Sequence, residues 1–365
     1  MKQIIPITFL ILSSFFQSCE KQDSPVNNLK HLEREVAGLI RERTRKLPFK
    51  APVAWALVQD GDVKSSYQQG YEIPDANTPV SDQSLFPLAS TTKLFTSVMV
   101  MKAAEEGKLL MSSKASEYID DLPATWQSIT ISHLLSHTDG IADVMDNSYY
   151  KALDPEIAEG LDRREYLEYA AQLPQHFRPG YQTRYGQSGY VLLSLVLEKL
   201  YEQSYETIVS QKILIPTGMN HTHFFTASDV IGTYKPQIFE PGGATGFKKI
   251  TPNYVYADYA TAGICTSMGD MIKFIHALQK QELLSKESFR RLYTPLEGVS
   301  GYTLGWEYRY KDGRLMAGHS GGWSVVVMHI PDTNATSIFL SSAADESILN
   351  TGYQVAEKAS AFTRQ

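Results

Sequence analysis

The chain has 365 residues, of which 43% are hydrophobic and 20% are charged, and its formal net charge is −6 at pH 7. This composition supports a large folded core and excludes a disordered chain. Acidic and basic residues are scattered along the whole sequence, so a nucleic-acid partner is not expected. A small molecule or a peptide is therefore the expected ligand.

Residues 1–18, MKQIIPITFLILSSFFQS, have the pattern of a secretory signal peptide, with one lysine, a short apolar core and small residues at the end. The apolar core is too short to be a membrane span. We therefore expect the mature chain to be exported. The stretch Phe16-Gln17-Ser18-Cys19 resembles a bacterial lipobox, in which the cysteine is lipidated and becomes the new N-terminus. A soluble secreted protein that is cleaved elsewhere is the alternative.

The lipobox resemblance implies a protein held at a lipid membrane through Cys19, in the bacterial cell envelope and facing the periplasm or the cell surface. Residues 19–27 then form a polar, lipidated tether. Cys265 is the second of the two cysteines in the chain, so the folded part is expected to have no internal disulfide. We expect Cys265 to be a small buried packing residue.

The first element expected in the folded part is a helix from about Leu29 to Lys46. A β-hairpin follows, with a strand at Val53–Val58 and a turn at Asp60-Gly61-Asp62. A long and largely helical middle comes next. Its expected helices are Leu94–Glu106, Gly189–Glu202 and Met268–Gln279.

Strand patterns return near the C-terminus, before a final helix. The strands are expected at Tyr302–Tyr310, Arg314–Gly318, Trp323–Ile330 and Ala335–Leu340, and the helix from about Leu349. This order predicts an α+β fold: an antiparallel sheet built from both chain ends and flanked by helices in an α/β sandwich, with an inserted, mostly helical lobe. We expect one domain over residues 28–365, with its α/β part in 28–88 and 298–365 and its helical part in 89–297.

Ser90 and Lys93 lie where an apolar segment, LFTSVMVM, begins, and this segment is expected to form a mostly buried helix. Residues three apart on a helix lie on one face, about 5–6 Å apart at Cβ, so the Lys93 amine can reach the Ser90 hydroxyl. Burial disfavours the ammonium form, and a neutral amine can accept the serine proton. Backbone N–H groups at the helix N-terminus would be available to an oxyanion.

The spacing by itself is a weak signal, because Ser-x-x-Lys also occurs from Ser18 to Lys21 and from Ser148 to Lys151. On these residues alone, Ser90 is equally well explained as an N-cap, with the Lys93 side chain extending to solvent. Partner motifs elsewhere in the chain have to decide between the two interpretations.

Six ordered landmarks make the chain resemble the serine β-lactamase-related family, which includes class C β-lactamases, D-alanyl-D-alanine carboxypeptidases and related esterases. The landmarks are Phe86–Lys93, Ile131–Gly140, Arg178-Pro179-Gly180, Tyr185-Gly186-Gln187, Pro216-Thr217-Gly218-Met219 and His319-Ser320-Gly321-Gly322. The resemblance covers nearly the whole mature chain. It implies a β-lactamase/transpeptidase-like fold and a serine hydrolase that forms an acyl-enzyme from a peptide, a β-lactam or a carboxyl ester, without a cofactor or a metal, most simply as a monomer.

The resemblance also implies roles for individual residues. Ser90 is the nucleophile, and Lys93 and Tyr185 carry its proton; an ordinary structural tyrosine is the alternative for Tyr185, since the chain has 21 tyrosines. Gln187 stands where the family usually has asparagine, so it keeps an amide on a longer arm, and its predicted contact with substrate is open.

The strand motif at His319 corresponds to the third element of the family, Lys-Thr-Gly or His-x-Gly. The resemblance implies that His319, Ser320 and Gly321 line the substrate cleft and that the Gly322 N–H forms the oxyanion hole together with the Ser90 N–H. A neutral or titrating imidazole holds a carboxylate less firmly than a fixed ammonium group. An ordinary strand histidine is the alternative.

Two other motifs have better structural explanations. Gly318–Gly322 satisfies Gly-x-Ser-x-Gly, but a strand-like segment follows Ser320 where an α/β-hydrolase has a helix, so Ser320 is not expected to be a nucleophile. His133 and His137 have the spacing of helical zinc ligands but lack the adjacent glutamate and an obvious third ligand. We expect them to brace the core or a loop.

A protein that binds penicillin or senses peptidoglycan without turnover, on the same fold, is the alternative function. The full set of proton-carrying residues favours an enzyme, and Gln187 favours the sensor. Substrate choice is expected to depend on the segments Asp143–Gly160 and Ala227–Tyr254.

Overall fold

The computed structural model describes residues 25–73, 77–148, 152, 160–224, 238–242, 247–250 and 256–363. The expected signal peptide, Cys19 and residues 20–24 of the expected tether lie outside these residues. Most of the segments Asp143–Gly160 and Ala227–Tyr254 lie outside them as well. Within the described part of the chain, no helix has both the length and the apolar character needed to cross a membrane.

The N-terminal helix α1 (Pro25–Thr44) begins earlier than expected and includes residues 25–27 of the expected tether. A proline at the first helical position is favourable, because its missing N–H would have no partner there and its φ angle already suits the helix. Helix α1 therefore includes three residues that were assigned to the tether.

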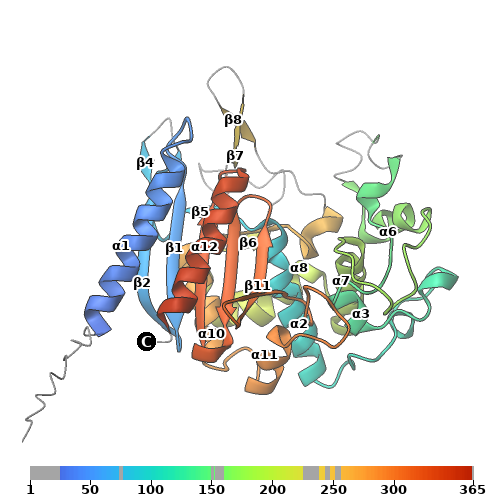
Figure 1. The fold of residues 1–365 in the computed structure, drawn as a ribbon. Helices are drawn as coiled ribbons and strands as arrows, with labels where there is room; N and C mark the ends of the chain where they lie inside the picture. Colours follow the sequence, from blue (N-terminus) through green and yellow to red (C-terminus); the bar gives the residue numbers. More distant parts are fainter. Residues whose placement is uncertain are drawn as a thin grey trace, which may run out of the picture.

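A six-stranded antiparallel sheet joins the two ends of the chain (Figure 1), as expected from the order of the elements. Its strands in spatial order are β10 (Glu307–Lys311), β11 (Arg314–Gly321), β12 (Val325–Ile330), β13 (Ala335–Ser341), β1 (Val53–Gln59) and β2 (Asp62–Gln69). The first and last parts of the chain meet at β1 and β13, where Trp55 is paired with Phe339. Strands β1 and β12 are buried on both faces, which is why they are almost continuously apolar.

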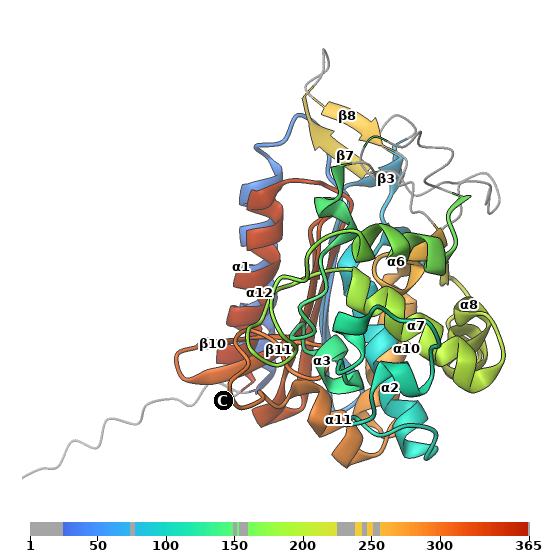
Figure 2. The ribbon, with the colours of Figure 1, turned by 90° about the vertical axis from the view of Figure 1, so that its right-hand side faces the viewer.

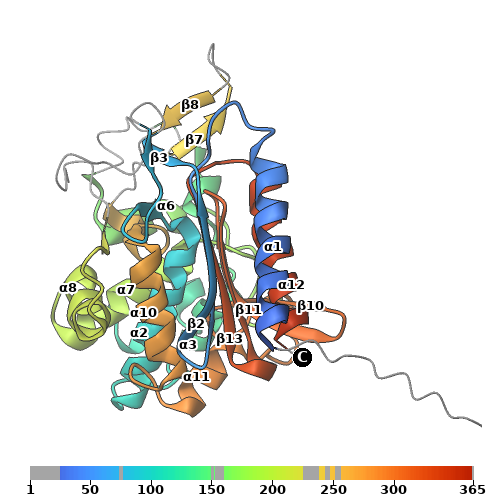
Figure 3. The same ribbon diagram turned by 90° about the vertical axis from the view of Figure 1, so that its left-hand side faces the viewer.

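Helices cover both faces of this sheet, as Figures 2 and 3 show. On one face lie α1 and α12 (Glu346–Phe362), which pack against each other and against Trp55 and Leu57 of β1. On the other face lie α10 (Met268–Gln279) and the helical part, against Ala54 and Ala56 of the same strand. Alternate residues of β1 thus serve two cores, as the two-residue period of a strand requires.

The helical part surrounds α2 (Lys93–Glu105), which is buried on nearly every side. Its other helices are α3 (Ile131–Leu135), α6 (Arg163–Ala171), α7 (Ser188–Tyr201), α8 (Tyr205–Val209), α9 (Ile215–Thr217) and α11 (Lys286–Tyr293). The expected helices at α2, α7 and α10 are present, with bounds within one residue of those predicted.

Two expectations about this part need correction. The helix α10 covers the large sheet, so residues 268–279 belong with the α/β part and not with the helical part. Short strands also occur within 89–297, and their few residues give no readable period. They are β6 (His223–Phe224), β7 (Ile238–Pro241), β8 (Phe247–Ile250) and β9 (Ile264–Ser267); β5 (Leu85–Pro87) pairs with β9, and β3 (Tyr71–Ile73) with β4 (Thr78–Pro79).

The strand expected from Tyr302 begins only at Glu307. Residues 303–306 form a turn in which the Thr303 N–H donates to the Trp306 carbonyl over 2.8 Å. Gly305 has φ +108°, and a Cβ there would lie 2.3 Å from the Ser97 Cβ on α2. The close approach of this turn to α2 therefore delays the start of the strand.

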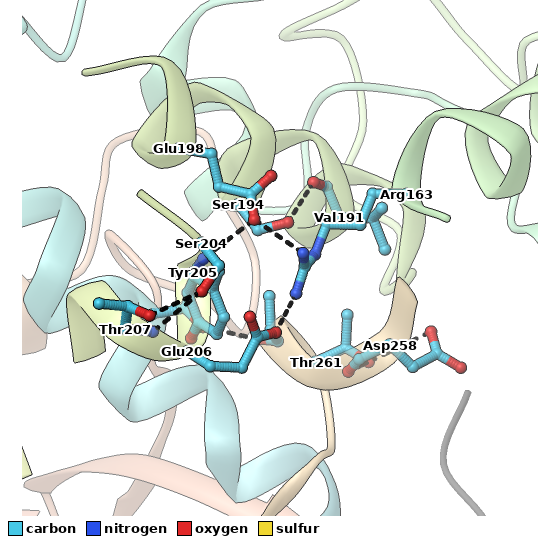
Figure 4. Close-up of polar contacts among 12 residues, drawn as sticks. Arg163, Val191, Ser194, Glu198, Ser204, Tyr205, Glu206, Thr207, Asp258 and Thr261 are labelled. Carbon is cyan, nitrogen blue, oxygen red and sulfur yellow. Dashed lines mark hydrogen bonds and ion pairs between the residues drawn. The ribbon is translucent and has the colours of Figure 1, made fainter. Parts of the chain in front are cut away.

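A buried arginine joins three helices of the helical part (Figure 4). Arg163, the first residue of α6, is 2% exposed and binds Glu198 on α7, over 2.7 Å, and Glu206 on α8. The same Glu198 carboxylate accepts the backbone N–H of Tyr205. Because both acids remain partly exposed, the charge of Arg163 is neutralised without burying either carboxylate completely.

The cluster is linked to α2 and to the short helical segment η7 (Tyr256–Ala260). The hydroxyl groups of Tyr205 and Thr96 lie 2.7 Å apart, and Thr96 donates to the Ala260 carbonyl over 2.6 Å. These bonds hold η7 against α2. The residue that follows η7, Thr261, lies beside Lys93.

Candidate active site

Ser90 lies in a tight helical turn, η2 (Ala89–Thr92), directly before α2. The turn is attached to β9, because the Leu88 N–H donates to the Ile264 carbonyl over 2.8 Å. Ala89 has φ +45°, in the left-handed region, which a residue with a Cβ adopts only where its surroundings hold it. The chain therefore bends sharply immediately before the serine.

Ser90 is not an N-cap, which excludes the structural interpretation of this serine. Helix α2 begins at Lys93 behind Thr92, and neither α2 nor η2 has a side-chain cap. The Ser90 hydroxyl oxygen instead accepts a hydrogen bond from the Tyr185 hydroxyl over 2.7 Å. Ser90 is also partly exposed, whereas its neighbours on both sides are buried.

The Lys93 side chain is completely buried, so the alternative in which it extends to solvent is excluded as well. Its amine donates to the Tyr185 hydroxyl over 2.8 Å, to the Gln187 carboxamide oxygen over 2.7 Å and to the Thr261 carbonyl over 3.1 Å. Three acceptors match the three N–H donors of an ammonium group. The nitrogen also lies 4.9 Å and 5.3 Å from the ring centres of Tyr185 and Tyr190.

A continuous hydrogen-bond chain thus runs from Lys93 through Tyr185 to Ser90 (2.8 and 2.7 Å). The amine reaches the serine through the phenol oxygen and not directly, as the three-residue spacing had suggested. Tyr185 lies just before α7, in a segment held by the Gln187 N–H, which donates to the Asp143 carboxylate over 2.8 Å. The structure therefore brings together the three residues expected to move the proton.

Gln187 is bound to Lys93 through its carboxamide oxygen. With this contact the glutamine side chain reaches the buried amine at 2.7 Å. Its oxygen belongs to the surroundings of the lysine, and only its amide nitrogen remains for a contact with substrate.

His319 lies on β11, on the face of the strand that carries Ala317 and Gly321 and faces the helical part. The side chain is 2% exposed. Burial, together with the nearby Lys93 amine, lowers the pKa of His319 to about 3, so its imidazole is neutral at physiological pH. Of the two states expected for this ring, neutral or titrating, the structure supports the neutral one.

The side chain of Ser320 points to the opposite face of the sheet, which corrects its predicted place in the cleft. Its hydroxyl donates to Glu307 over 3.2 Å, and Glu307 also accepts from the Tyr353 hydroxyl of α12 over 2.8 Å. Neighbouring strand residues face opposite sides, so His319 and Ser320 cannot both face Ser90. Only the backbone of Ser320 remains for a ligand, and the Gly-x-Ser-x-Gly motif holds no nucleophile.

The two glycines after Ser320 have different roles. A Cβ at Gly321 would lie 2.2 Å from the Leu88 carbonyl oxygen and 3.1 Å from the Thr91 hydroxyl, whereas a Cβ at Gly322 would meet no heavy atom within 4 Å. The serine turn thus occupies the space that we expected a substrate backbone to use at Gly321. Open space is found at Gly322, where the second oxyanion N–H is expected.

We expect Gly321→Ala to lower the free energy of unfolding by about 1–3 kcal/mol, because the added methyl group must displace the serine turn. The rate at which a fluorophosphonate labels Ser90 should fall at least about tenfold, since the same turn positions the hydroxyl. Gly322→Ala is the matched control for stability, and it should change the unfolding free energy by less than about 0.5 kcal/mol. Equal stability of the two variants in denaturant would contradict this account of Gly321.

Aromatic rings enclose the Tyr185 side chain, and the sequence did not reveal them. The His137 ring centre lies 4.7 Å from that of Tyr185, 5.2 Å from that of Tyr190 and 4.7 Å from that of Tyr302. Burial is the main cause that lowers the pKa of His137 well below its usual value, and the nearby Lys93 and His319 side chains lower it further. His137 is therefore a neutral packing partner of the tyrosine.

The brace expected at His133 and His137 fits their contacts. The His133 Nδ1 accepts the Thr130 N–H over 3.2 Å at the start of α3. Among the described residues, no group of three or more histidine, cysteine, aspartate or glutamate side chains is arranged to hold a metal ion. Cys265 is buried on β9, and burial raises the pKa of its thiol, as suits a packing residue.

Two acids near this site were also missed, the buried Asp139 and the partly buried Asp258. Burial raises the pKa of Asp258 to about 6. A hydrogen bond from Tyr166 and the positive charge of Lys93 act in the opposite direction and lower it in part. Burial raises the pKa of Asp139 to about 7. The Ile141 N–H donates to the Asp139 carboxylate over 2.8 Å, and this hydrogen bond offsets part of the increase. Asp139 lies in the sequence landmark that contains His137, so this motif could have pointed to it. Asp258 lies in none of the six landmarks.

A partly exposed serine hydroxyl, bonded to a half-buried tyrosine that is itself bonded to a buried lysine, is arranged for transfer of an acyl group to the serine. The fold and this site together define the class of serine hydrolases with a β-lactamase/transpeptidase-like fold.

The chain belongs to the β-lactamase family, whose sequence pattern matches residues 44–359. This confirms the resemblance inferred from the six landmarks. Penicillin-binding protein 4* of Bacillus subtilis (strain 168) is 28% identical over 342 residues, which cover 88% of this chain and 73% of the relative. Protein flp of Staphylococcus aureus (strain NCTC 8325 / PS 47) is 25% identical over 309 residues, which cover 80% of this chain and 59% of that protein.

Solved structures confirm the fold class. The D-amino acid amidase from Ochrobactrum anthropi SV3, in complex with D-phenylalanine, superposes with a TM-score of 0.77, covering 92% of this chain and 99% of the amidase. The two sequences are 17% identical, so the likeness concerns the fold.

Proposed function

We propose that this protein is an exported, membrane-anchored serine hydrolase that cleaves an ester or an amide through an acyl-enzyme. The observation that carries the proposal is the hydrogen-bond chain from the buried Lys93 through Tyr185 to the partly exposed Ser90. A lysine without solvent contact, placed two hydrogen bonds from a serine hydroxyl, has a clear use in moving the serine proton.

In the proposed reaction, Ser90 Oγ attacks the substrate carbonyl carbon. Its proton passes to the Tyr185 oxygen while the tyrosine proton passes to the Lys93 amine in its neutral form. The carbonyl oxygen becomes an oxyanion held by the N–H groups of Ser90 and Gly322. When the intermediate collapses, the bond to the leaving group breaks and the stored proton returns through Tyr185 to that group. Water then attacks the acyl-enzyme by the same route and frees Ser90.

The resting hydrogen bonds point in the opposite direction, because Tyr185 donates to Ser90 and Lys93 donates to Tyr185. Attack therefore requires Lys93 to lose a proton and the Tyr185 hydroxyl to turn toward it. Both changes involve hydrogens only, and the heavy atoms already lie within hydrogen-bond distance.

Peptides, β-lactams and carboxyl esters are the proposed substrates. The relative named as a penicillin-binding protein and the neighbour named as a D-amino acid amidase support a carbonyl substrate of this kind.

A sensor that is acylated without turnover is the second candidate, and Gln187 favours it. Its carboxamide oxygen accepts from Lys93 over 2.7 Å, so this side chain is engaged at the lysine and offers a substrate only its amide nitrogen.

Stopped-flow hydrolysis of a chromogenic ester and of nitrocefin, with mass spectrometry of the intact protein, tests both candidates. The hydrolase should show steady turnover and a transient mass increase on Ser90. A single burst with a stable adduct would support the sensor. Absence of any adduct with either substrate, together with absence of fluorophosphonate labelling, would contradict both.

The anchor is a separate part of the proposal and rests on the lipobox resemblance at Cys19. Expressed with its N-terminus in a bacterium, the protein should enter the detergent phase and carry a lipid on Cys19. Cys19→Ser should move it to the aqueous phase, and an unchanged distribution would remove the anchor from the proposal.

A further inference from the structure

We infer that His319 presents a hydrogen-bond acceptor to the substrate, so that the site favours substrates with an N–H donor at this position, such as a carboxamide or an ammonium group, over substrates with a carboxylate. The inference rests on the proposed serine hydrolase function and adds a substrate class to it. It concerns which ring nitrogen of His319 carries the proton.

The contact of Nδ1 decides the tautomer. His319 Nδ1 lies 2.7 Å from the carbonyl oxygen of Ser320. A carbonyl oxygen can only accept, so the hydrogen bond requires a proton on Nδ1. In the neutral ring the second nitrogen, Nε2, then carries a lone pair and no proton.

The surroundings of His319 keep the ring neutral. The groups that interact with it are the Lys93 amine of α2, the neutral imidazole of His137 and the Tyr185 ring, whose centre lies 6.1 Å away. None of these three groups supplies a negative charge to stabilise an imidazolium. The acid on the neighbouring strand, Glu307, binds Ser320 on the other face of the sheet.

The acceptor has no partner in the ligand-free protein. His319 Nε2 is buried and forms no hydrogen bond to any described residue. Buried polar atoms in folded proteins are nearly always paired, and an exception calls for a functional explanation. A donor on a bound substrate would give Nε2 the partner that it lacks.

The position of His319 places this acceptor on the face of β11 that holds the serine turn. Gly321, on the same face of β11, touches the serine turn at Leu88. His319 precedes Gly321 by two residues, which is roughly 7 Å along a strand. A substrate whose carbonyl group lies at Ser90 therefore reaches Nε2 with a group a few bonds from the scissile bond.

The lone pair on His319 Nε2 distinguishes substrate groups that donate a hydrogen bond from carboxylates. An N–H group donates directly to the lone pair. A carboxylate carries only acceptor oxygens at neutral pH, so it meets the lone pair with repulsion and loses its hydration. An ammonium group in the place of the imidazole would reverse the preference.

Matched phosphonate esters test the inference on the full folded chain. Three aryl phosphonates carry the same side arm, ending in a carboxamide, a methyl ester or a carboxylate, and the rate at which each labels Ser90 is measured at pH 7. The carboxamide and the methyl ester have the same charge and similar size, so their ratio isolates the N–H donor. We expect the carboxamide to react about tenfold faster than the methyl ester, and the carboxylate to react slowest.

Two variants extend the test. In His319→Lys the carboxylate should become the fastest of the three, and in His319→Gln, which keeps an acceptor oxygen, the carboxamide should remain ahead of the carboxylate. Equal rates in the wild type, or a wild-type preference for the carboxylate, would overturn the inference while leaving the hydrolase proposal intact. Absence of Ser90 labelling by all three compounds would instead overturn the hydrolase proposal and the inference with it.

NMR of protein with 15N-labelled histidine measures which ring nitrogen of His319 is protonated, and it does not require any variant to be active. The His319 signals, assigned by their loss in His319→Gln, should show a protonated Nδ1 and an unprotonated Nε2. They should stay constant from pH 5 to pH 8. A proton on Nε2, or titration within this range, would overturn the inference even if the variants fail to fold.

Discussion

Replacing Ser90 by alanine should reduce turnover of every ester and amide substrate to the background rate, a loss of roughly 10⁵-fold or more, and should abolish labelling by a fluorophosphonate. The hydroxyl is the partly exposed end of a hydrogen-bond chain that runs through the half-buried Tyr185 to the buried Lys93, and no other atom of residue 90 can form the acyl bond. Because Ser90 caps no helix, the free energy of unfolding should change by less than about 1 kcal/mol.

Ser320→Ala is the matched control, since Ser320 is the serine that stands in the alternative nucleophile motif. Its hydroxyl faces α12 and donates to Glu307, so labelling of Ser90 should persist in this variant. Retained hydrolysis by purified Ser90→Ala protein, or loss of labelling in Ser320→Ala with an intact fold, would reject the assignment of the nucleophile.

Replacing Lys93 by methionine should lower kcat by about 10³-fold while Ser90 and the fold remain in place, because the group that receives the proton is lost. The change also leaves the Thr261 carbonyl and the Gln187 oxygen without their donor. We expect the free energy of unfolding to fall by about 1–3 kcal/mol for these unpaired acceptors. Kinetics and denaturant unfolding, measured on the same preparation, separate the two effects.

Lys102→Met provides the control on the same helix. Lys102 is partly exposed, and its amine contacts the Leu283 carbonyl over 3.1 Å, on a face of α2 away from Ser90. Its kcat should stay within about twofold of the wild type. Equal losses in the two lysine variants would show that α2 as a whole, and not the Lys93 amine, is responsible.

Much of the fold could be predicted because its main elements are long and periodic. The residues of α10 were predicted without error: its apolar positions repeat at helical spacing, and Ser267 caps it by accepting the Asp270 N–H. Strands β6 and β9 were missed because two to four residues carry no measurable period. The role of α10 as a cover of the large sheet depends on packing, which local periodicity does not encode.

Within the candidate site, the sequence by itself predicted which residues would carry the chemistry. Ser90, Lys93, Tyr185 and His319 stand in ordered motifs, and a motif records the side chains that a reaction needs. The sequence left two interpretations of Ser90 and Lys93 open, because capping and solvation depend on what surrounds a residue.

Only the tertiary structure decided how these residues are connected. It buries Lys93, pairs it with the Thr261 carbonyl 168 residues away, turns Ser320 to the far face and sets His319 Nδ1 at 2.7 Å from the Ser320 carbonyl oxygen. Hydrogen bonds and desolvation act between atoms within a few ångströms of each other, and folding brings such atoms together from segments that are distant in the chain.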